Sequence, residues 1–165
     1  MRVLVLAVLV LVSVILEGTV LHSFAIGGVK PDLLLIWVSL FAFLEGPVRG
    51  FKYGFLIGFV EDLVTGKFFG LHALTKMITG FIIGTLEPKI FKENYLVPIV
   101  VVFLGTLLNE LLYLLFGNII GFNFPWSTGL RHIILPLSFY NCLAAPFLYV
   151  PLYKLYSRKW LKNED

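Results

Sequence analysis

The chain has 165 residues, of which 59% are hydrophobic and 14% are charged, and its mean hydropathy is +0.94. Soluble domains carry about 25% charged residues, so this composition excludes a soluble globular protein and indicates an integral membrane protein. The formal net charge is +3, but the basic residues lie in short groups between apolar runs, a pattern that indicates membrane topology signals and lipid anchors in place of nucleic-acid binding.

Apolar runs separated by Gly, Pro and charged residues predict six membrane-spanning helices. We expect them at about residues 3–22, 32–46, 50–64, 68–86, 95–117 and 131–156. A spanning helix needs about 20 apolar residues, so six of them leave no room for a soluble catalytic domain. The prediction is an all-α, polytopic membrane protein with six transmembrane helices in a single integral membrane domain, residues 1–165.

Two of these helices allow another interpretation. The run at 3–22 resembles a signal peptide, but it is long and has no clean small-residue cleavage site, so we interpret it as a retained first helix. The second and third runs are short enough to form one re-entrant hairpin. That arrangement would carry Arg49 and Lys52 into the membrane, so we favour two short spans.

The positions of the basic residues predict the orientation, because Lys and Arg accumulate on the cytoplasmic side. Nine of the 13 basic residues fall on one predicted face: Arg2, Arg49, Lys52, Lys89, Lys92, Lys154, Arg158, Lys159 and Lys162. Both termini are therefore expected in the cytoplasm. The longest external loop is then the aromatic segment 116–126, which we interpret as an anchor at the membrane interface, with a ligand lid as the alternative.

Glu17, in the first helix, belongs to a set of polar residues that this topology places in the outer half of the membrane. The others are Lys76 in the fourth helix and Asn109 with Glu110 in the fifth. Because intramembrane charges are costly and rarely face lipid, we predict a polar network in which Lys76 pairs with Glu110 or Glu17. Alternatively, Glu17 reaches the outer interface by itself.

Pro31 and Asp32 open the second helix, at positions where Pro is tolerated and an acid is favoured. The simpler interpretation of Asp32 is an N-terminal cap. The alternative is that it faces a partner from outside the membrane.

Small residues recur at every fourth position through the third helix and beyond it. The series comprises Gly50, Gly54, Gly58, Asp62, Gly66 and Gly70. Residues at this spacing share one helix face and allow close backbone packing in lipid, either within the chain or against a partner. Glu61 and Asp62 point about 100° apart on a helix, which disfavours a shared metal. We expect Asp62 to accept backbone N–H groups at the start of the next helix.

The remaining reactive side chains are isolated in the sequence. His22, His72 and His132 lack a second ligand at metal-binding spacing, and Cys142 has no partner for a disulfide. The sequence contains no Ser/His/Asp arrangement, phosphate loop or CxxC. We therefore expect neither an enzyme nor a cofactor or metal site.

Residues 31–74 resemble the bacterial rod shape-determining protein MreD family. The matching features are PDLLLI at 31–36, the link EGPVRG at 45–50, and the run GFVEDLVTGKFFGLHAL at 58–74. They cover about a quarter of the chain, and the other helices match in length and hydropathy. The resemblance implies a non-enzymatic component of the cell-elongation machinery in the cytoplasmic membrane, which supports peptidoglycan synthesis.

The same resemblance implies partners and a rival function. The partners are MreC and, through it, the peptidoglycan synthase RodA, its class B penicillin-binding protein and MreB filaments, together with membrane lipid. The glycine series would shape the region that docks the single membrane helix of MreC. The family is also thought similar in fold to the S components of energy-coupling-factor transporters, which implies the alternative of a vitamin-binding subunit.

Overall fold

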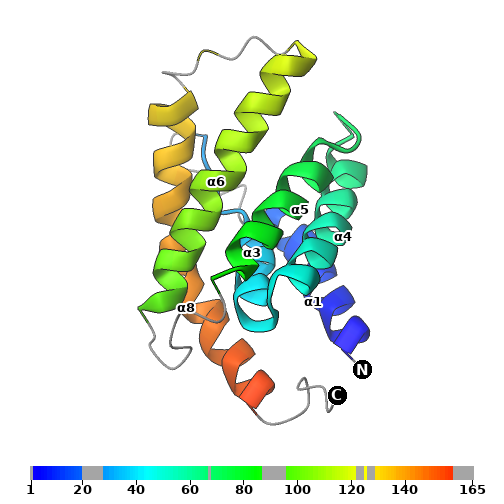
Figure 1. Cartoon of the computed structure of the whole chain (residues 1–165), viewed down its shortest axis with the longest axis vertical. Helices are drawn as coiled ribbons and strands as arrows, with labels where there is room; N and C mark the ends of the chain where they lie inside the picture. Colours follow the sequence, from blue (N-terminus) through cyan, green and yellow to red (C-terminus); the bar gives the residue numbers. More distant parts are fainter. Residues whose placement is uncertain are drawn as a thin grey trace.

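The protein is a bundle of helices in a computed structural model that describes residues 2–19, 28–66, 68–86, 96–121, 125 and 129–157. Six α-helices lie in these ranges and no β-strand does (Figure 1): α1 (Arg2–Gly18), α3 (Leu33–Glu45), α4 (Pro47–Thr65), α5 (Leu71–Gly84), α6 (Val97–Ile120) and α8 (Leu135–Ser157). A π-helical turn, η2 (Leu130–Ile134), precedes α8. The all-α prediction with six helices is confirmed for the described residues.

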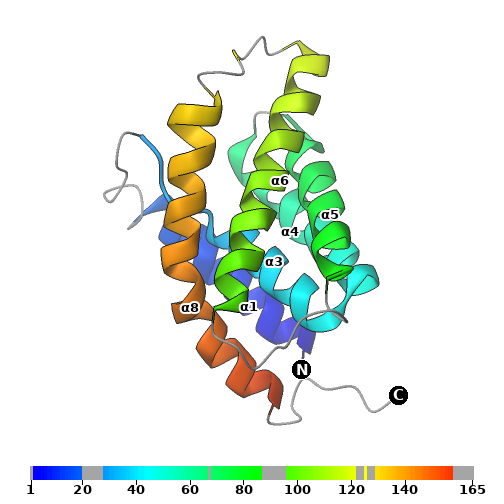
Figure 2. The ribbon, with the colours of Figure 1, turned by 60° about the vertical axis from the view of Figure 1, so that its left-hand side comes forward.

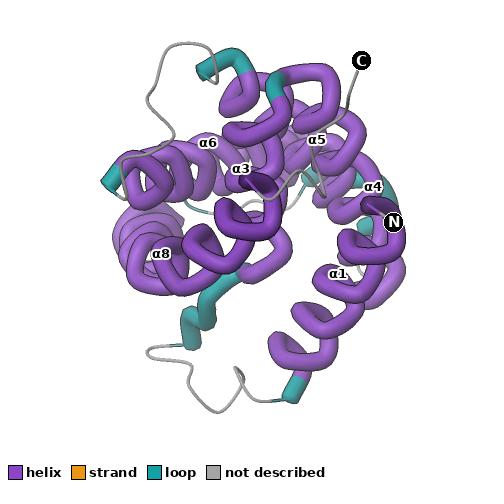
Figure 3. Tube along the Cα trace, turned by 90° about the horizontal axis from the view of Figure 1, so that it is seen from below, coloured by secondary structure: helices purple, strands orange, loops and turns teal. Residues whose placement is uncertain are grey.

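Helix α3 forms the centre of the bundle. Its residues 34–44 are all buried, with exposures between 0% and 5%. The cause is a sequence that is apolar on every side, because such a helix has no face that favours an aqueous or interfacial position. The other five helices surround it (Figure 3), and α3 packs against α1, α4, α5, α6 and α8.

Helix α3 is also short, and this places its first residues inside the bundle. Its 13 residues span about 20 Å at 1.5 Å per residue, against about 30 Å for the membrane hydrocarbon. A non-helical segment, residues 28–32, leads to it, and α3 begins partway along α6 in Figures 1 and 2. The polar residues before α3 are therefore carried into the interior.

The helices alternate in direction, so that three ends meet at one side of the bundle. The start of α1, the α3–α4 link and the end of α8 lie together at the lower side of Figure 1. The link is a single residue, Gly46, at φ 88°, followed by Pro47 in the first turn of α4. Proline is favoured there because its missing N–H has no partner in a helix start. Both ends of the described chain therefore lie on one side.

Helices α6 and α8 are the longest apolar elements. The segments Val97–Ile120 and Leu130–Lys154 are long and apolar enough to cross a membrane. Residues 116–120, which the sequence assigned to an external loop, instead form the last turns of α6, and residues 122–124 and 126 lie outside the described ranges. Helix α8 contains Pro146 and Pro151 and bends in that region (Figure 2), since an internal proline removes a backbone hydrogen bond.

Candidate functional site

Asp62 organises the turn between α4 and α5. Its Oδ1 accepts the backbone N–H of His72, and its Oδ2 accepts those of Gly70 and Ala73, each at 3.0 Å. N–H groups in a first helical turn have no partner inside the helix, and the helix dipole favours a carboxylate beside them. The sequence-based expectation for Asp62 agrees with this geometry.

Gly66 and Gly70, which bracket the same turn, have a conformational role. Their φ angles are +64° and +95°, in the left-handed region that other residues adopt at a cost. A Cβ atom at either position would meet nothing within 4 Å. These two glycines therefore serve the turn, and they form no packing surface.

Gly50, Gly54 and Gly58 form the interface between α4 and α5. A Cβ atom would overlap the carbonyl oxygen of Gly80 if placed on Gly50, of Lys76 if placed on Gly54, and of His72 if placed on Gly58. All three glycines are buried. Of the two alternatives for this face, the structure shows packing within the chain, because α5 occupies it.

Lys76 carries a buried charge at the centre of the bundle. Its side chain is 0% exposed, and its Nζ lies 2.8 Å from Asp32 Oδ2 and 2.8 Å from Glu61 Oε2. The prediction that Lys76 pairs with Glu17 or Glu110 is therefore wrong. Its ammonium group pairs with Asp32 and Glu61. The reason is that α3 is short and begins inside the bundle, so that Asp32 lies at the depth of Lys76. From the sequence, Asp32 was expected at the outer end of its helix, away from Lys76.

Asp32 links four segments of the bundle. Its Oδ1 accepts the N–H of Leu35 at 2.7 Å, so it caps α3 as expected, while its Oδ2 accepts from Lys76 on α5. Its own N–H donates to Asn141 Oδ1 on α8, and Asn141 Nδ2 donates to Thr106 Oγ1 on α6. Both Asn141 and Thr106 are fully buried. The helix cap and the ion pair of Asp32, together with the bonds through Asn141, thus join α3, α5, α6 and α8.

Glu17 belongs to this polar region but contacts different atoms. Its Oε1 accepts the N–H of Leu34 at 3.1 Å, at the start of α3, and its backbone carbonyl accepts from Lys30 Nζ at 2.9 Å. One turn earlier on α1, Ser13 Oγ accepts from Trp37 Nε1 at 2.9 Å. These bonds attach α1 to α3.

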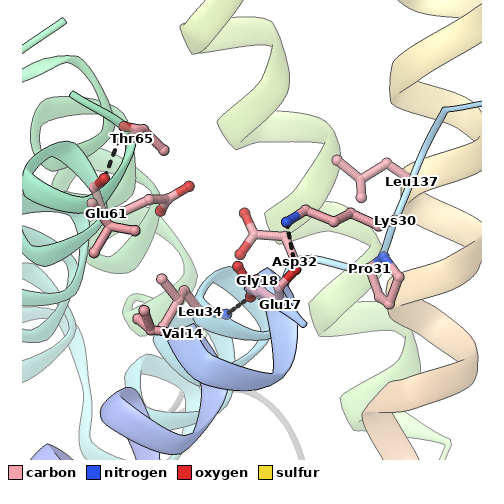
Figure 4. Close-up of a pocket in the computed structure, with 11 residues that line it drawn as sticks. Val14, Glu17, Gly18, Lys30, Pro31, Asp32, Leu34, Glu61, Thr65 and Leu137 are labelled. Carbon is pink, nitrogen blue, oxygen red and sulfur yellow. Dashed lines mark hydrogen bonds between the residues drawn. The ribbon is translucent and has the colours of Figure 1, made fainter. Parts of the chain in front are cut away.

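A pocket of about 240 Å³ opens beside these residues (Figure 4). Glu17, Asp32, Glu61 and Lys30 line it together with apolar side chains of α1, α3, α4 and α8. In Figure 4, Glu61 on α4 faces Glu17 and Asp32 across the space. The pocket therefore has both charged and apolar walls.

Asn109 and Glu110 lie on α6, on another side of the Lys76 cluster. Asn109 Nδ2 donates to Glu110 Oε1 at 3.1 Å. The His72 ring packs at a tilt of 30° against Tyr113 of α6, with centroids 4.8 Å apart, and His72 Nδ1 lies 3.4 Å from Glu61 Oε1. His72 is thus connected to Lys76 through Glu61, which contacts both.

Sequence patterns did not predict a role for Asn141, Thr106 or Tyr113, and they gave Glu61 no partner. Asn141 lies in an apolar run, and a buried amide there needs a hydrogen-bond partner. This was the only sign in the sequence that Asn141 belongs to a polar cluster. Of the remaining histidines, His132 is exposed in η2, and His22 lies outside the described residues. No group of three or more potential metal ligands occurs in the described part of the chain.

Comparison with known proteins identifies a family. The model of the family described as rod shape-determining protein MreD matches residues 1–159 of this chain. No curated protein and no solved structure matches the chain. The similarity to S components of energy-coupling-factor transporters stays a prediction.

Proposed function

Because this chain belongs to the MreD family of rod shape-determining membrane proteins, we propose that it is a non-enzymatic component of the bacterial cell-elongation complex. In this role it binds MreC in the cytoplasmic membrane and supports peptidoglycan synthesis by RodA and its class B penicillin-binding protein, with MreB filaments inside the cell. The family match over residues 1–159 carries the proposal.

The proposed topology has six spans and both termini in the cytoplasm. Two observations support it: nine of the 13 basic residues belong to one predicted face, and the two ends of the described chain lie on one side of the bundle (Figure 1). Labelling of single cysteines with a membrane-impermeant maleimide in intact cells tests the orientation. Cysteine in place of Lys52 should stay unlabelled until the cells are opened, whereas cysteine in place of Phe69 should react at once.

The docking surface in this proposal is the outer face of α4. Phe51, Phe55 and Phe59 form a ridge at every fourth residue, with exposures of 43%, 46% and 42%. The rings of Phe55 and Phe59 stack, with centroids 6.1 Å apart. About 100° around the helix from this ridge, the glycines hold α4 against the backbone of α5. A ridge on such a closely packed helix pair offers a rigid surface to a single helix, which binds in lipid by close packing.

Disulfide cross-linking tests this surface directly. In a Cys142→Ala background, Phe55→Cys should cross-link to single cysteines placed along the membrane helix of MreC. Leu143→Cys on α8 is the matched control, because Leu143 is a large apolar residue that is 70% exposed. Cross-links from Leu143→Cys alone would move the docking surface to α8, and cross-links from neither position would contradict docking on both faces.

A further inference from the structure

The pocket in Figure 4 gathers charged groups from three separate segments. Glu17 comes from the last turn of α1, Asp32 from the residue before α3, and Glu61 from α4. Lys76, whose side chain is fully buried, contacts Asp32 and Glu61 with a single ammonium group. Two carboxylates thus share one positive charge, and the third, Glu17, is bonded to a backbone N–H.

Lys30 supplies a positive charge at the same pocket. Its Nζ donates to the backbone carbonyl of Glu17 at 2.9 Å. An ammonium group has three donors, so this bond leaves capacity for an anionic oxygen. The pocket consequently offers acceptors for a cationic group beside a donor for an anionic group, which is a pattern that recognises a zwitterion.

The rest of the pocket is apolar and its size is limited. Val14, Leu34, Val64 and Leu137 complete its walls. Its volume of about 240 Å³ is below the range of about 300–1,000 Å³ that is usual for drug-sized ligands. A vitamin is therefore a poor fit, whereas a small polar group with an attached hydrocarbon chain matches both the volume and the walls.

We propose that this pocket binds the zwitterionic headgroup of an aminophospholipid. The primary ammonium lies among the carboxylates of Glu17, Asp32 and Glu61, and the phosphate lies against Lys30. Val14, Val64 and Leu137 contact the first part of the lipid chains. The ammonium compensates carboxylates whose burial in a membrane protein is otherwise costly. Soluble phosphoethanolamine carries the same ammonium and phosphate, and the experiment below separates the two sources.

Native mass spectrometry of the purified full chain tests the proposal. The protein is delipidated in mild detergent and given equal amounts of phosphatidylethanolamine and phosphatidylcholine, which share the phosphate. The quaternary ammonium of phosphatidylcholine has no N–H to donate to carboxylates. We expect about tenfold more bound phosphatidylethanolamine, a factor that corresponds to about 1.4 kcal/mol. Equal retention of the two lipids would overturn the proposal.

Two variants separate the two halves of the headgroup. Glu17→Gln keeps an oxygen for the Leu34 N–H but removes the charge, so it should abolish the preference for phosphatidylethanolamine. Lys30→Gln should weaken the binding of both lipids alike. The control is Glu45→Gln, which removes a carboxylate at the other end of α3, where Glu45 contacts Arg49 and Tyr53. Its lipid preference should be unchanged.

Soluble phosphoethanolamine identifies the source. If it displaces phosphatidylethanolamine at millimolar concentration, the headgroup alone is sufficient, and a soluble zwitterion is the ligand. If it does not, the lipid chains are required. The preference of the wild type for phosphatidylethanolamine must in either case disappear in Glu17→Gln. A preference that persists in a folded Glu17→Gln protein, or equal effects of Lys30→Gln and Glu45→Gln, would refute the site. Recovery of MreC is measured separately, so the outcome does not depend on the docking proposal.

Discussion

Replacing Lys76 with Met removes the buried ammonium and keeps an unbranched side chain of similar shape. Asp32 and Glu61 then remain in the interior with side chains that are only 16% and 14% exposed. Removing one partner of a buried ion pair costs about 3–5 kcal/mol, because an uncompensated charge is left behind. Since Lys76 contacts two carboxylates, we expect the free energy of unfolding to fall by at least that amount.

Unfolding in mixed micelles of a mild detergent and increasing dodecyl sulfate, followed by circular dichroism, measures this loss. Lys52→Met is the matched control, because Lys52 is exposed on α4 and the same chemical change should alter stability by no more than about 0.5 kcal/mol. If the two variants lose equal stability, Lys76 does not hold the buried cluster.

A rescue variant separates lost charge balance from lost packing. Adding Asp32→Asn and Glu61→Gln to Lys76→Met removes the uncompensated negative charges. Asn caps a helix as well as Asp does, so the cap on Leu35 is retained. Replacing all members of a buried ion pair by uncharged groups is often close to neutral, and we expect the triple variant to recover most of the loss. A triple variant less stable than Lys76→Met alone would refute the electrostatic explanation.

Three further substitutions have expected costs in the same unfolding assay. Gly54→Ala should cost about 1–3 kcal/mol because the new methyl group overlaps the α5 backbone. The control is Gly18→Ala, which should cost no stability because a Cβ atom there meets nothing within 4 Å. Equal effects of the two substitutions would contradict the close packing of α4 on α5. Asp62→Ala removes the acceptor of three N–H groups and should cost more than about 3 kcal/mol, and a cost below 1 kcal/mol would contradict its role in the turn. Trp37→Phe leaves Ser13 without its indole donor and should cost about 1 kcal/mol, which an unchanged midpoint would contradict.

The helices were predictable where an apolar run ends at a residue that stops or caps a helix, as at Asp32 and Gly46 on either side of α3. Asp62 was predictable for a similar reason, since its bonds are local, within 11 residues along the chain. Gly50, Gly54 and Gly58 were recognised as a packing face, but their spacing does not say which helix they pack against. The structure identifies α5.

The partners of Lys76 were not predictable, because they depend on the depth at which α3 begins. The sequence shows Pro31 and Asp32 before an apolar run, which is equally compatible with a helix that begins at the membrane surface. The non-helical segment that carries Asp32 inward is a consequence of tertiary packing. The bond from Asp32 to Asn141 joins residues 109 positions apart, and no local pattern specifies such a contact.

The proposed function requires that this membrane protein bind MreC within the cell-elongation complex. This requirement is tested by affinity purification of the tagged chain from its native membrane in mild detergent, with mass spectrometry of the bound proteins. We expect recovery of MreC together with the wall-synthesis enzymes, and loss of MreC when Phe55 and Phe59 on the α4 ridge are both replaced by Ala. Recovery of an ATPase-coupled transporter module without MreC would contradict the proposed function.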